Sequence, residues 1–281
     1  MKIQSVLHEG YSILYYAEVE TPMLDATVLL SEATGLRKEK LLASLPDEID
    51  DYSYKRFKQF LDLRCSGIPV SYIRHKKEFF GLEFYVDERV LVPRPDTETL
   101  VEAAIEKAKA DSNIKDILDI CTGSGCVAIA LKYNLKKLNV SASDISRDAL
   151  DVCALNSAKI LGHSIPMYLS DLFKSVPGKY DIITGNPPYL LADEVEGLKK
   201  LKWPEPKLAL YGGKDGVETA GRIIEDAPSW LNKGGYLMLE AAESQMPLLD
   251  NLMLLRGYVS IYTVKDLADR ERVICGRYSS A

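Results

Sequence analysis

Short apolar runs alternate with helical segments from residue 114 to the end of the chain. This alternation is typical of a sheet of parallel strands that is covered by helices on both faces. The expected strands are residues 117–120, 140–143, 167–169, 181–184, 236–239, 259–264 and 272–277. The expected helices are residues 126–133, 149–161, 216–230 and 244–255. Only residues 265–271 separate the last two strands, so we expect those strands to pair as an antiparallel hairpin.

The first 75 residues have a different pattern, with apolar residues at helical spacing. One helix is expected to begin at Thr21-Pro22 and to stop at Gly35, and shorter helices fit residues 38–45 and 52–65. This region predicts a small helical bundle, either a docking surface for a substrate or a stabilising appendage. Residues 76–92 predict a β-hairpin linker, and residues 93–281 form the remaining domain, which begins with a helix over residues 97–109.

Charge and composition exclude several classes of protein. The net charge of -6 and the pI of about 5.3 argue against a protein that grips duplex nucleic acid along a whole face. The odd number of cysteines and the absence of a C-x-x-C pair indicate reduced thiols in the cytoplasm. The three histidines lie far apart, so no metal site is expected. We expect neither a signal peptide nor a membrane span, and because the sequence shows no long amphipathic heptad we expect a monomer.

The stretch Asn186-Pro187-Pro188-Tyr189 follows the expected strand 181–184. Neither proline has an N–H to donate, so the strand must end there, at the edge of the sheet where ligands bind. A planar –NH2 group is a poor nucleophile, and two acceptors on its hydrogens would fix it and raise the electron density on its nitrogen. The Asn186 side-chain oxygen and the Pro187 carbonyl can supply these acceptors, and Tyr189 can pack on the planar group. The alternative is a structural Pro-Pro turn.

A glycine-containing turn, Asp119-Ile120-Cys121-Thr122-Gly123-Ser124-Gly125, leads from the first expected strand into a helix. Glycine lets a ligand approach the backbone, and the helix N-terminus supplies N–H groups. A dinucleotide site would have G-x-G-x-x-G, and this turn has only G-x-G. The Asp119 carboxylate suits a positively charged part of a ligand, such as an amino group. The alternative is a tight strand–helix turn.

Acidic residues also end the next two expected strands. Asp144 can accept hydrogen bonds from both hydroxyls of a ribose, as an acidic residue does in nucleotide-binding folds. Asp171 can accept from the exocyclic amine of an adenine, while Leu172 and Phe173 cover the ring. Each aspartate alone is more often a helix cap, and Asp144 is placed to cap the following helix. Ligand-suited residues at four successive strand ends favour a binding site.

These motifs resemble the N(5)-glutamine methyltransferases that modify peptide-chain release factors, the HemK/PrmC family. The resemblance covers nearly the whole chain, through residues 70–73, 79–84, 91–98, 117–119, 186–189, 205–206, 208–210 and 270–273. The Asn-Pro-Pro-Tyr turn alone is shared with the amino methyltransferases of DNA adenine. The Pro93-Arg94-Pro95 segment and the helical N-terminal region point to the release-factor family.

The resemblance implies a Rossmann-like seven-stranded methyltransferase sheet with an antiparallel last strand, and S-adenosyl-L-methionine as the methyl donor. The implied cofactor-binding residues are Asp119, Cys121, Thr122, Gly123, Gly125, Asp144, Asp171, Leu172, Phe173 and Asn186. The implied acceptor is the glutamine of a Gly-Gly-Gln motif, held by Asn186, Pro187, Pro188 and Tyr189. Cys121 and His75 stand where the family usually has glycine. Arg94 and Glu205 lie in matched segments without an assigned role.

Three other functions use some of the same features. A DNA adenine methyltransferase would use the same turn on a flipped base, but it would want a basic cleft or a target-recognition domain. A cofactor-binding scaffold without activity would not need the pair of acceptors at Asn186 and Pro187. A nicotinamide dehydrogenase is disfavoured by the missing third glycine.

Overall fold

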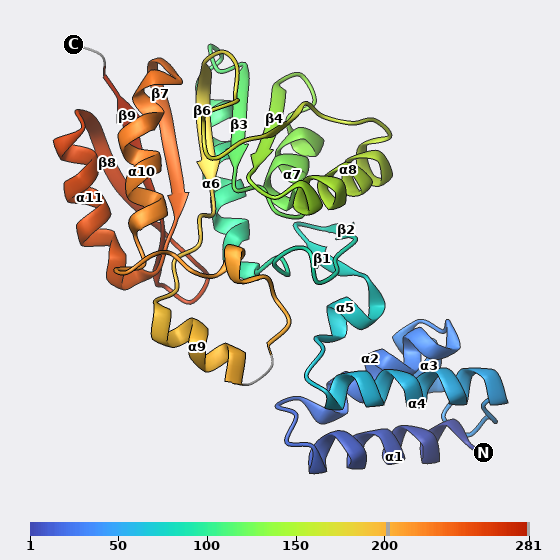
Figure 1. The fold of residues 1–281 in the computed structure, drawn as a ribbon. Coiled ribbons are helices and arrows are strands. Elements are labelled where there is room, and N and C mark those ends of the chain that lie inside the picture. The colour runs from blue at the N-terminus through green and yellow to red at the C-terminus, as the bar shows by residue number, and fades with distance from the viewer. Residues whose placement is uncertain (201–202, 280–281) are drawn as a thin grey trace. The chain divides into compact units, whose positions relative to one another are not determined.

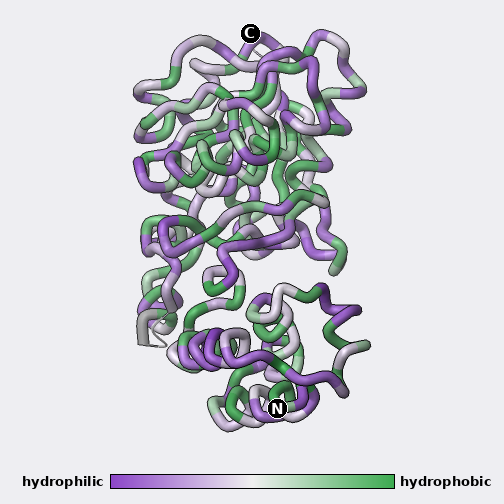
Figure 2. Tube along the Cα trace, turned by 90° about the vertical axis from the view of Figure 1, so that its right-hand side faces the viewer, coloured by the Kyte–Doolittle hydropathy of each residue, from purple (hydrophilic) through white to green (hydrophobic). Residues whose placement is uncertain are grey.

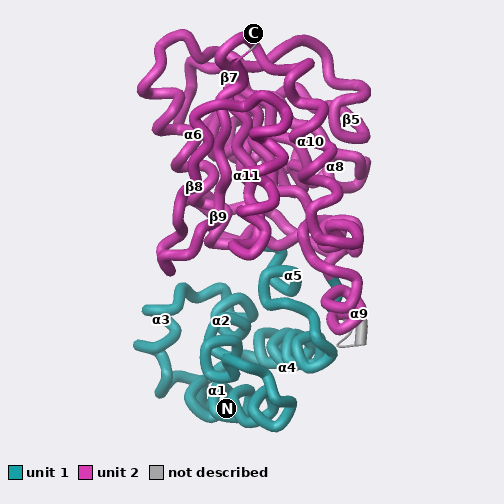
Figure 3. The backbone as a smooth tube through the Cα atoms, turned by 90° about the vertical axis from the view of Figure 1, so that its left-hand side faces the viewer, with its two compact units in different colours: residues 1–76, 199–204 teal, residues 77–198, 205–281 magenta. Residues whose placement is uncertain are grey.

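The computed structural model describes residues 1–200 and 203–279. The chain divides into two compact units (Figure 3). The first unit contains Met1–Lys76 and Lys199–Pro204, and the second contains Lys77–Leu198 and Glu205–Ala281. A membrane-spanning helix needs about 20 apolar residues, and within the described ranges no helix meets the requirements of length and apolarity.

The first unit is helical (Figure 1). Its helices are α1 (Ile3–Tyr16), α2 (Pro22–Thr34), α3 (Lys38–Ala43), α4 (Asp51–Cys65) and α5 (Val70–Arg74). Gly35 ends α2 in the left-handed conformation, with φ 69°, as its role of stop signal predicted. Gly10 lets α1 approach α4 closely, because a Cβ on Gly10 would lie 2.4 Å from the Phe57 ring. The short helix α5 was not expected as a separate element.

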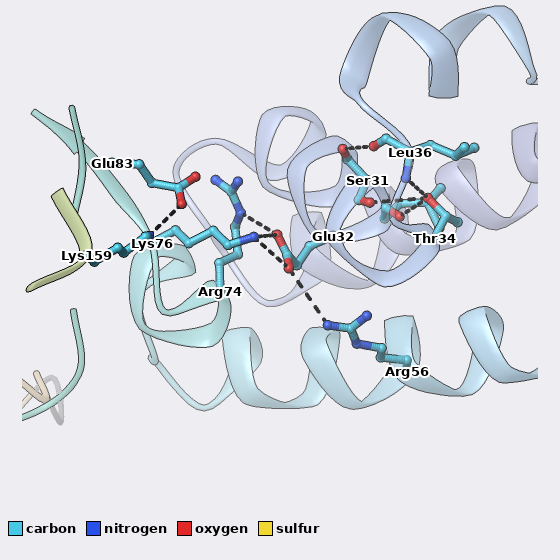
Figure 4. Close-up of polar contacts among 10 residues, drawn as sticks. Ser31, Glu32, Thr34, Leu36, Arg56, Arg74, Lys76, Glu83 and Lys159 are labelled. Atoms are coloured by element: carbon cyan, nitrogen blue, oxygen red, sulfur yellow. Dashed lines mark hydrogen bonds and ion pairs between the residues drawn. The ribbon is translucent and has the colours of Figure 1, made fainter. Parts of the chain in front are cut away.

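One partly buried acid, Glu32, joins three helices of this unit (Figure 4). Glu32 on α2 accepts from Arg74 Nε at 3.3 Å and from Lys76 Nζ at 3.4 Å. The Arg56 guanidinium on α4 lies 3.8 Å from the same carboxylate. These ion pairs anchor Arg74 at the end of α5 and Lys76, two residues later, against α2 and α4.

A two-stranded hairpin opens the second unit. Strand β1 (Lys77–Phe79) pairs antiparallel with β2 (Leu82–Phe84) through a two-residue turn in which both residues have positive φ. The expected hairpin over 76–92 is therefore too long. Asn156 gives the physical reason, because its side chain accepts from Tyr85 N at 2.6 Å and donates to Tyr85 O at 3.0 Å. These bonds replace the contacts that a strand partner would make.

The rest of the second unit is built on a seven-stranded sheet in the order β5-β4-β3-β6-β7-β9-β8. The strands are β3 (Asp116–Ile120), β4 (Asn139–Asp144), β5 (Met167–Leu169), β6 (Tyr180–Gly185), β7 (Leu231–Glu240), β8 (Tyr258–Lys265) and β9 (Glu271–Tyr278). Strand β9 is antiparallel to both of its neighbours, and the other strand pairs are parallel. The predicted fold class and antiparallel last strand are confirmed. Strand β7 begins earlier than expected, at Leu231.

Helices cover both faces of the sheet. The segments α6 (Glu98–Ala110), α7 (Cys126–Asn134) and α8 (Arg147–Leu161) contribute to the hydrophobic core on one face. The segments α10 (Glu218–Asp226) and α11 (Met246–Leu255) contribute to the core on the other face. The expected helix 216–230 stops at Asp226 and continues as a 3-10 turn over Ala227–Ser229. Helix α9 (Ala192–Lys200) was not expected. Figure 2 shows hydrophobic segments in the interior of this unit.

Candidate active site

A pocket of about 480 Å³ lies at the carboxyl ends of β3, β4, β5 and β6. Its walls come from the turns after these strands, from the segment around Arg94 and from the segment between Pro206 and Tyr211, all within the second unit. Its volume falls within the range of roughly 300–1,000 Å³ that is typical of small-molecule sites. The strand ends therefore meet at one site, as the sequence predicted.

Asp119 is the most deeply buried acid of the pocket wall. Its side chain accepts from Thr122 Oγ1 at 2.6 Å and from Thr184 Oγ1 at 2.8 Å, and the residue is only 1% exposed. Burial raises the pKa of Asp119 to about 7, although the two hydroxyl donors act in the opposite direction. A cation that binds beside this carboxyl would favour its ionised form. The site therefore suits a positively charged group.

The turn after Asp119 has three residues in the left-handed conformation. Their φ angles are 54° at Cys121, 54° at Gly123 and 80° at Gly125. A Cβ on Gly123 would meet nothing within 4 Å, whereas a Cβ on Gly125 would lie 2.5 Å from Cys153 Sγ. Gly123 thus leaves open space in the pocket wall, and Gly125 permits close packing behind it. Cys121 adopts a conformation that glycine adopts more readily.

Asp144 is held by backbone N–H groups on both sides. Its carboxylate accepts from Gly123 N and from Ser146 N, each at 2.9 Å. Burial raises the pKa of Asp144, while these N–H donors oppose the shift. The cap of α8 is Ser146, which accepts from Ala149 N at 3.2 Å. Since Ser146 caps the helix, the Asp144 carboxylate can face the pocket with its remaining lone pairs.

Asp171 and the two residues after it diverge in position. Asp171 accepts from Lys174 Nζ at 2.7 Å and from Arg222 Nη2 at 2.9 Å, and these donors lower its pKa. Asp171 and Leu172 line the pocket, and Leu172 has a φ of 52°. Phe173 lies outside the lining and stacks on Trp230, with ring centroids 5.0 Å apart.

Asn186 follows β6 directly and reaches the pocket. Its Nδ2 donates to Thr97 Oγ1 at 3.2 Å, which leaves the side-chain oxygen as an acceptor. Pro188 also lines the pocket, whereas Pro187 and Tyr189 lie outside the lining. Burial raises the pKa of the Tyr189 hydroxyl.

The backbone of the Asn-Pro-Pro-Tyr turn is held from behind. Gln245 Nε2 donates to Tyr189 O at 3.0 Å and to Gly216 O at 3.2 Å. Gly212 permits a close approach to the turn, because a Cβ there would lie 2.6 Å from Pro188 O. These contacts make the turn a rigid support for Asn186.

Arg94 and Glu205 also have defined places. Glu205 is buried, and its carboxylate accepts from Val92 N at 2.9 Å and from Arg94 Nη2 at 2.5 Å. This ion pair holds the segment around Arg94 against the pocket. Within the described residues, no group of three or more His, Cys, Asp or Glu side chains has the arrangement of a metal site.

Sequence reasoning missed two residues beside Asn186, namely Thr97 and Glu240. Glu240 ends β7 and is 1% exposed. An acid at the end of an apolar strand is the same signal that identified Asp119 and Asp144, so the sequence contained the clue. Thr97 precedes α6 and gave no comparable signal.

Two family descriptions match the chain. "PrmC N-terminal domain" matches residues 5–74, and "Methyltransferase small domain" matches residues 96–198. A release factor glutamine methyltransferase of Clostridium acetobutylicum is 36% identical over 98% of this chain and 98% of its own length. The protein of the same name from Bacillus subtilis is 35% identical over 89% of each chain.

Solved structures agree with the fold. A crystal structure of ribosomal protein L11 methylase from Lactobacillus delbrueckii subsp. bulgaricus has a TM-score of 0.51 and 22% identity. The match covers 69% of this chain and 84% of that one. At this identity the likeness shows the fold alone.

Proposed function

The chain belongs to the family of release factor glutamine methyltransferases, and on this premise we propose that it methylates a glutamine of a peptide-chain release factor and so modulates translation termination. The enzyme transfers a methyl group from S-adenosyl-L-methionine to the side-chain amide nitrogen. One observation carries the proposal most strongly. Asn186 presents a free amide oxygen to a pocket whose walls bear carboxylates at three further strand ends.

The residues of the pocket fit the proposed cofactor. The Asp119 carboxyl offers a partner for the amino group of the cofactor. The open space at Gly123 leaves room for the aliphatic segment that bears this amino group. Asp144 offers lone pairs to ribose hydroxyls, and Asp171 with Leu172 offers an acceptor and an apolar surface to adenine. Phe173 supports this segment from the core through its contact with Trp230. When bound, S-adenosyl-L-methionine supplies an electrophilic methyl group on its sulfonium.

The turn after β6 would orient the acceptor. Asn186 Oδ1 and the carbonyl of Pro187 accept the two hydrogens of the glutamine –NH2 group, and Tyr189 packs against its plane. These contacts would hold the glutamine nitrogen in a fixed orientation for the methyl donor, and such positioning contributes up to roughly 7–11 kcal/mol in favourable cases. No strong base is needed before transfer, because the methylated amide loses its proton readily to water.

The finer assignments also belong to the proposal. The accepting glutamine is that of a Gly-Gly-Gln motif, whose two glycines add no side chains to obstruct entry into the pocket. The helical unit of residues 1–75 docks the release factor. The enzyme acts in the cytoplasm as a monomer, without direct contact to nucleic acid, in keeping with the net charge of -6.

Methyl transfer from labelled S-adenosyl-L-methionine tests the proposal. The acceptors are purified release factor, the same factor with Gln→Ala in its Gly-Gly-Gln motif, and duplex DNA at moderate salt. We expect label on the unaltered factor alone. Label on DNA instead would identify an adenine methyltransferase, and intact cofactor binding without any transfer would indicate a scaffold.

A further inference from the structure

Glu240 is a buried carboxyl that the proposed reaction does not use. It is 1% exposed, and neither of its oxygens makes a hydrogen bond to any described residue. A buried acid without a partner lowers the stability of a fold, so an apolar side chain would serve packing better. Its presence at this position calls for a role in the adjoining site.

The strand register places Glu240 beside Asn186. Gly185 at the end of β6 is paired with Leu239 of β7, so the next residue of each strand lies alongside the other. Alternate residues of a strand face opposite sides of the sheet. Ile182 and Met238 face the core that contains α6, and Asn186 and Glu240 share that parity. Both side chains therefore point toward the start of α6.

Thr97 stands at this start and connects the two side chains. It is 2% exposed, and its Oγ1 accepts from Asn186 Nδ2 at 3.2 Å. A hydroxyl that accepts one hydrogen bond still has its own hydrogen to donate. The Glu240 carboxyl lies close enough for Thr97 and Asn186 to lower its pKa. A small side-chain adjustment would let Thr97 donate to Glu240 while it accepts from Asn186.

We propose that Thr97 and Glu240, here called the supporting pair, are positioning residues that fix which end of the Asn186 amide faces the pocket. This inference rests on the proposed function. When the Thr97 hydroxyl hydrogen points to an ionised Glu240, a lone pair of Thr97 Oγ1 faces Asn186, so Thr97 can only accept a hydrogen bond from Asn186. The Asn186 amide must then turn its –NH2 group toward Thr97 and its oxygen toward the side-chain nitrogen of the substrate glutamine.

Protonation of Glu240 would reverse the direction of the hydrogen bonds that link Glu240, Thr97 and Asn186. The acid would donate to Thr97, and the Thr97 hydrogen would turn to the Asn186 oxygen. The –NH2 group of Asn186 would then face the pocket, where it cannot accept a hydrogen from glutamine. Burial raises the pKa of Glu240 to about 7, and the Asp96 carboxylate acts in the same direction. Arg272 on β9 opposes the shift, and the Tyr189 hydroxyl and the Cys126 thiol are further titratable groups that interact with Glu240.

Two substitutions test the supporting pair through turnover. Glu240→Gln keeps the shape but can donate or accept toward Thr97, and Thr97→Val removes the hydroxyl. Each should lower kcat on the order of tenfold to a hundredfold, because an Asn186 oxygen that faces away from the pocket no longer holds the glutamine nitrogen in place. The dissociation constant for S-adenosyl-L-methionine should stay within about twofold, since the pair acts through Asn186 rather than on the cofactor. Thr97→Ser, which restores the hydroxyl, should recover most of the lost turnover.

Matched controls separate positioning from folding. Glu243→Gln makes the same change at an exposed position three residues away, and Thr99→Val makes the other change at a buried threonine of α6 outside the pocket lining. The double variant Thr97→Val with Glu240→Gln should lose no more turnover than the worse single variant, because both act through one amide. Additive losses, or kcat within about twofold of wild type in both single variants, would overturn the inference.

The pH profile and an NMR experiment give readouts that a structural role would not move. With saturating cofactor, kcat of the wild type should rise as pH increases through about 7, and this rise should vanish in Glu240→Gln. The Asn186 side-chain amide signals, assigned by their loss in Asn186→Ala, should titrate over the same range in wild type but not in Glu240→Gln. This spectrum needs no turnover, so it decides the inference even if the release factor is not methylated. Amide signals that do not respond to pH would refute it.

Discussion

Binding of S-adenosyl-L-methionine should become weaker as the pH falls below 7, and Asp119 should cause the change. Its carboxyl lies beside two hydroxyl donors but is 1% exposed, and burial raises its pKa to about 7. A positively charged amino group can bind favourably only to the ionised form. At low pH the binding reaction must therefore also remove a proton.

The magnitude follows from the fraction of Asp119 that is ionised. With a pKa of about 7, about one half is ionised at pH 7 and about one eleventh at pH 6. The dissociation constant should therefore be about fivefold higher at pH 6 than at pH 7, which corresponds to about 1 kcal/mol. Binding should release about 0.9 proton at pH 6 and about 0.5 at pH 7.

Isothermal titration calorimetry in buffers of different ionisation enthalpy measures both quantities. Asp119→Asn, which keeps the shape of the side chain, should abolish the pH dependence and the proton release. The same should hold for wild type with 5′-methylthioadenosine, which lacks the amino group. A wild-type affinity that is equal at the two pH values, or proton release that persists in Asp119→Asn, would refute this reasoning.

Three further predictions concern single side chains. Asn186→Ala should abolish methyl transfer while calorimetry finds cofactor affinity within about threefold of wild type, because the lost oxygen serves the acceptor; normal turnover would disprove its role. Asn156→Ala should lower the free energy of unfolding in urea by about 2–4 kcal/mol, since three hydrogen bonds, two to Tyr85 and one to Ser124 O, lose their partner; a loss below about 1 kcal/mol would contradict this account. Cys121→Gly should raise the free energy of unfolding by up to about 1 kcal/mol, because the strain energy of a left-handed cysteine exceeds the free energy by which glycine's conformational entropy stabilises the unfolded state. A clear decrease of this free energy in a urea titration would contradict the prediction and show that the thiol packs favourably.

The sheet was predictable from the sequence because its central strands are buried on both faces. Such strands appear as short apolar runs between helical segments, and β3, β4 and β6 all begin and end within one residue of expectation. Helix α9 was missed because its apolar signal is weak. Among residues 192–198 of this helix, only Val195 is buried, and it lies between two glutamates.

The site was predictable where a strand end alone decides the position of a side chain. Asp119, Asp144 and Asn186 reach one pocket because the carboxyl ends of parallel strands meet at one edge. Phe173 was not placed in the lining, because the left-handed residue before it redirects the chain toward Trp230. Contacts such as Asn156 with Tyr85 join residues far apart in the sequence, and no local pattern predicts them.

The most direct test of the central claim is tandem mass spectrometry of release factor after incubation with the enzyme and S-adenosyl-L-methionine. The account predicts one added methyl group on the side-chain nitrogen of the glutamine in the Gly-Gly-Gln peptide, absent when Asn186→Ala replaces the wild-type enzyme. A methyl group on another residue, or an unmodified factor in the presence of active, cofactor-binding enzyme, would contradict it.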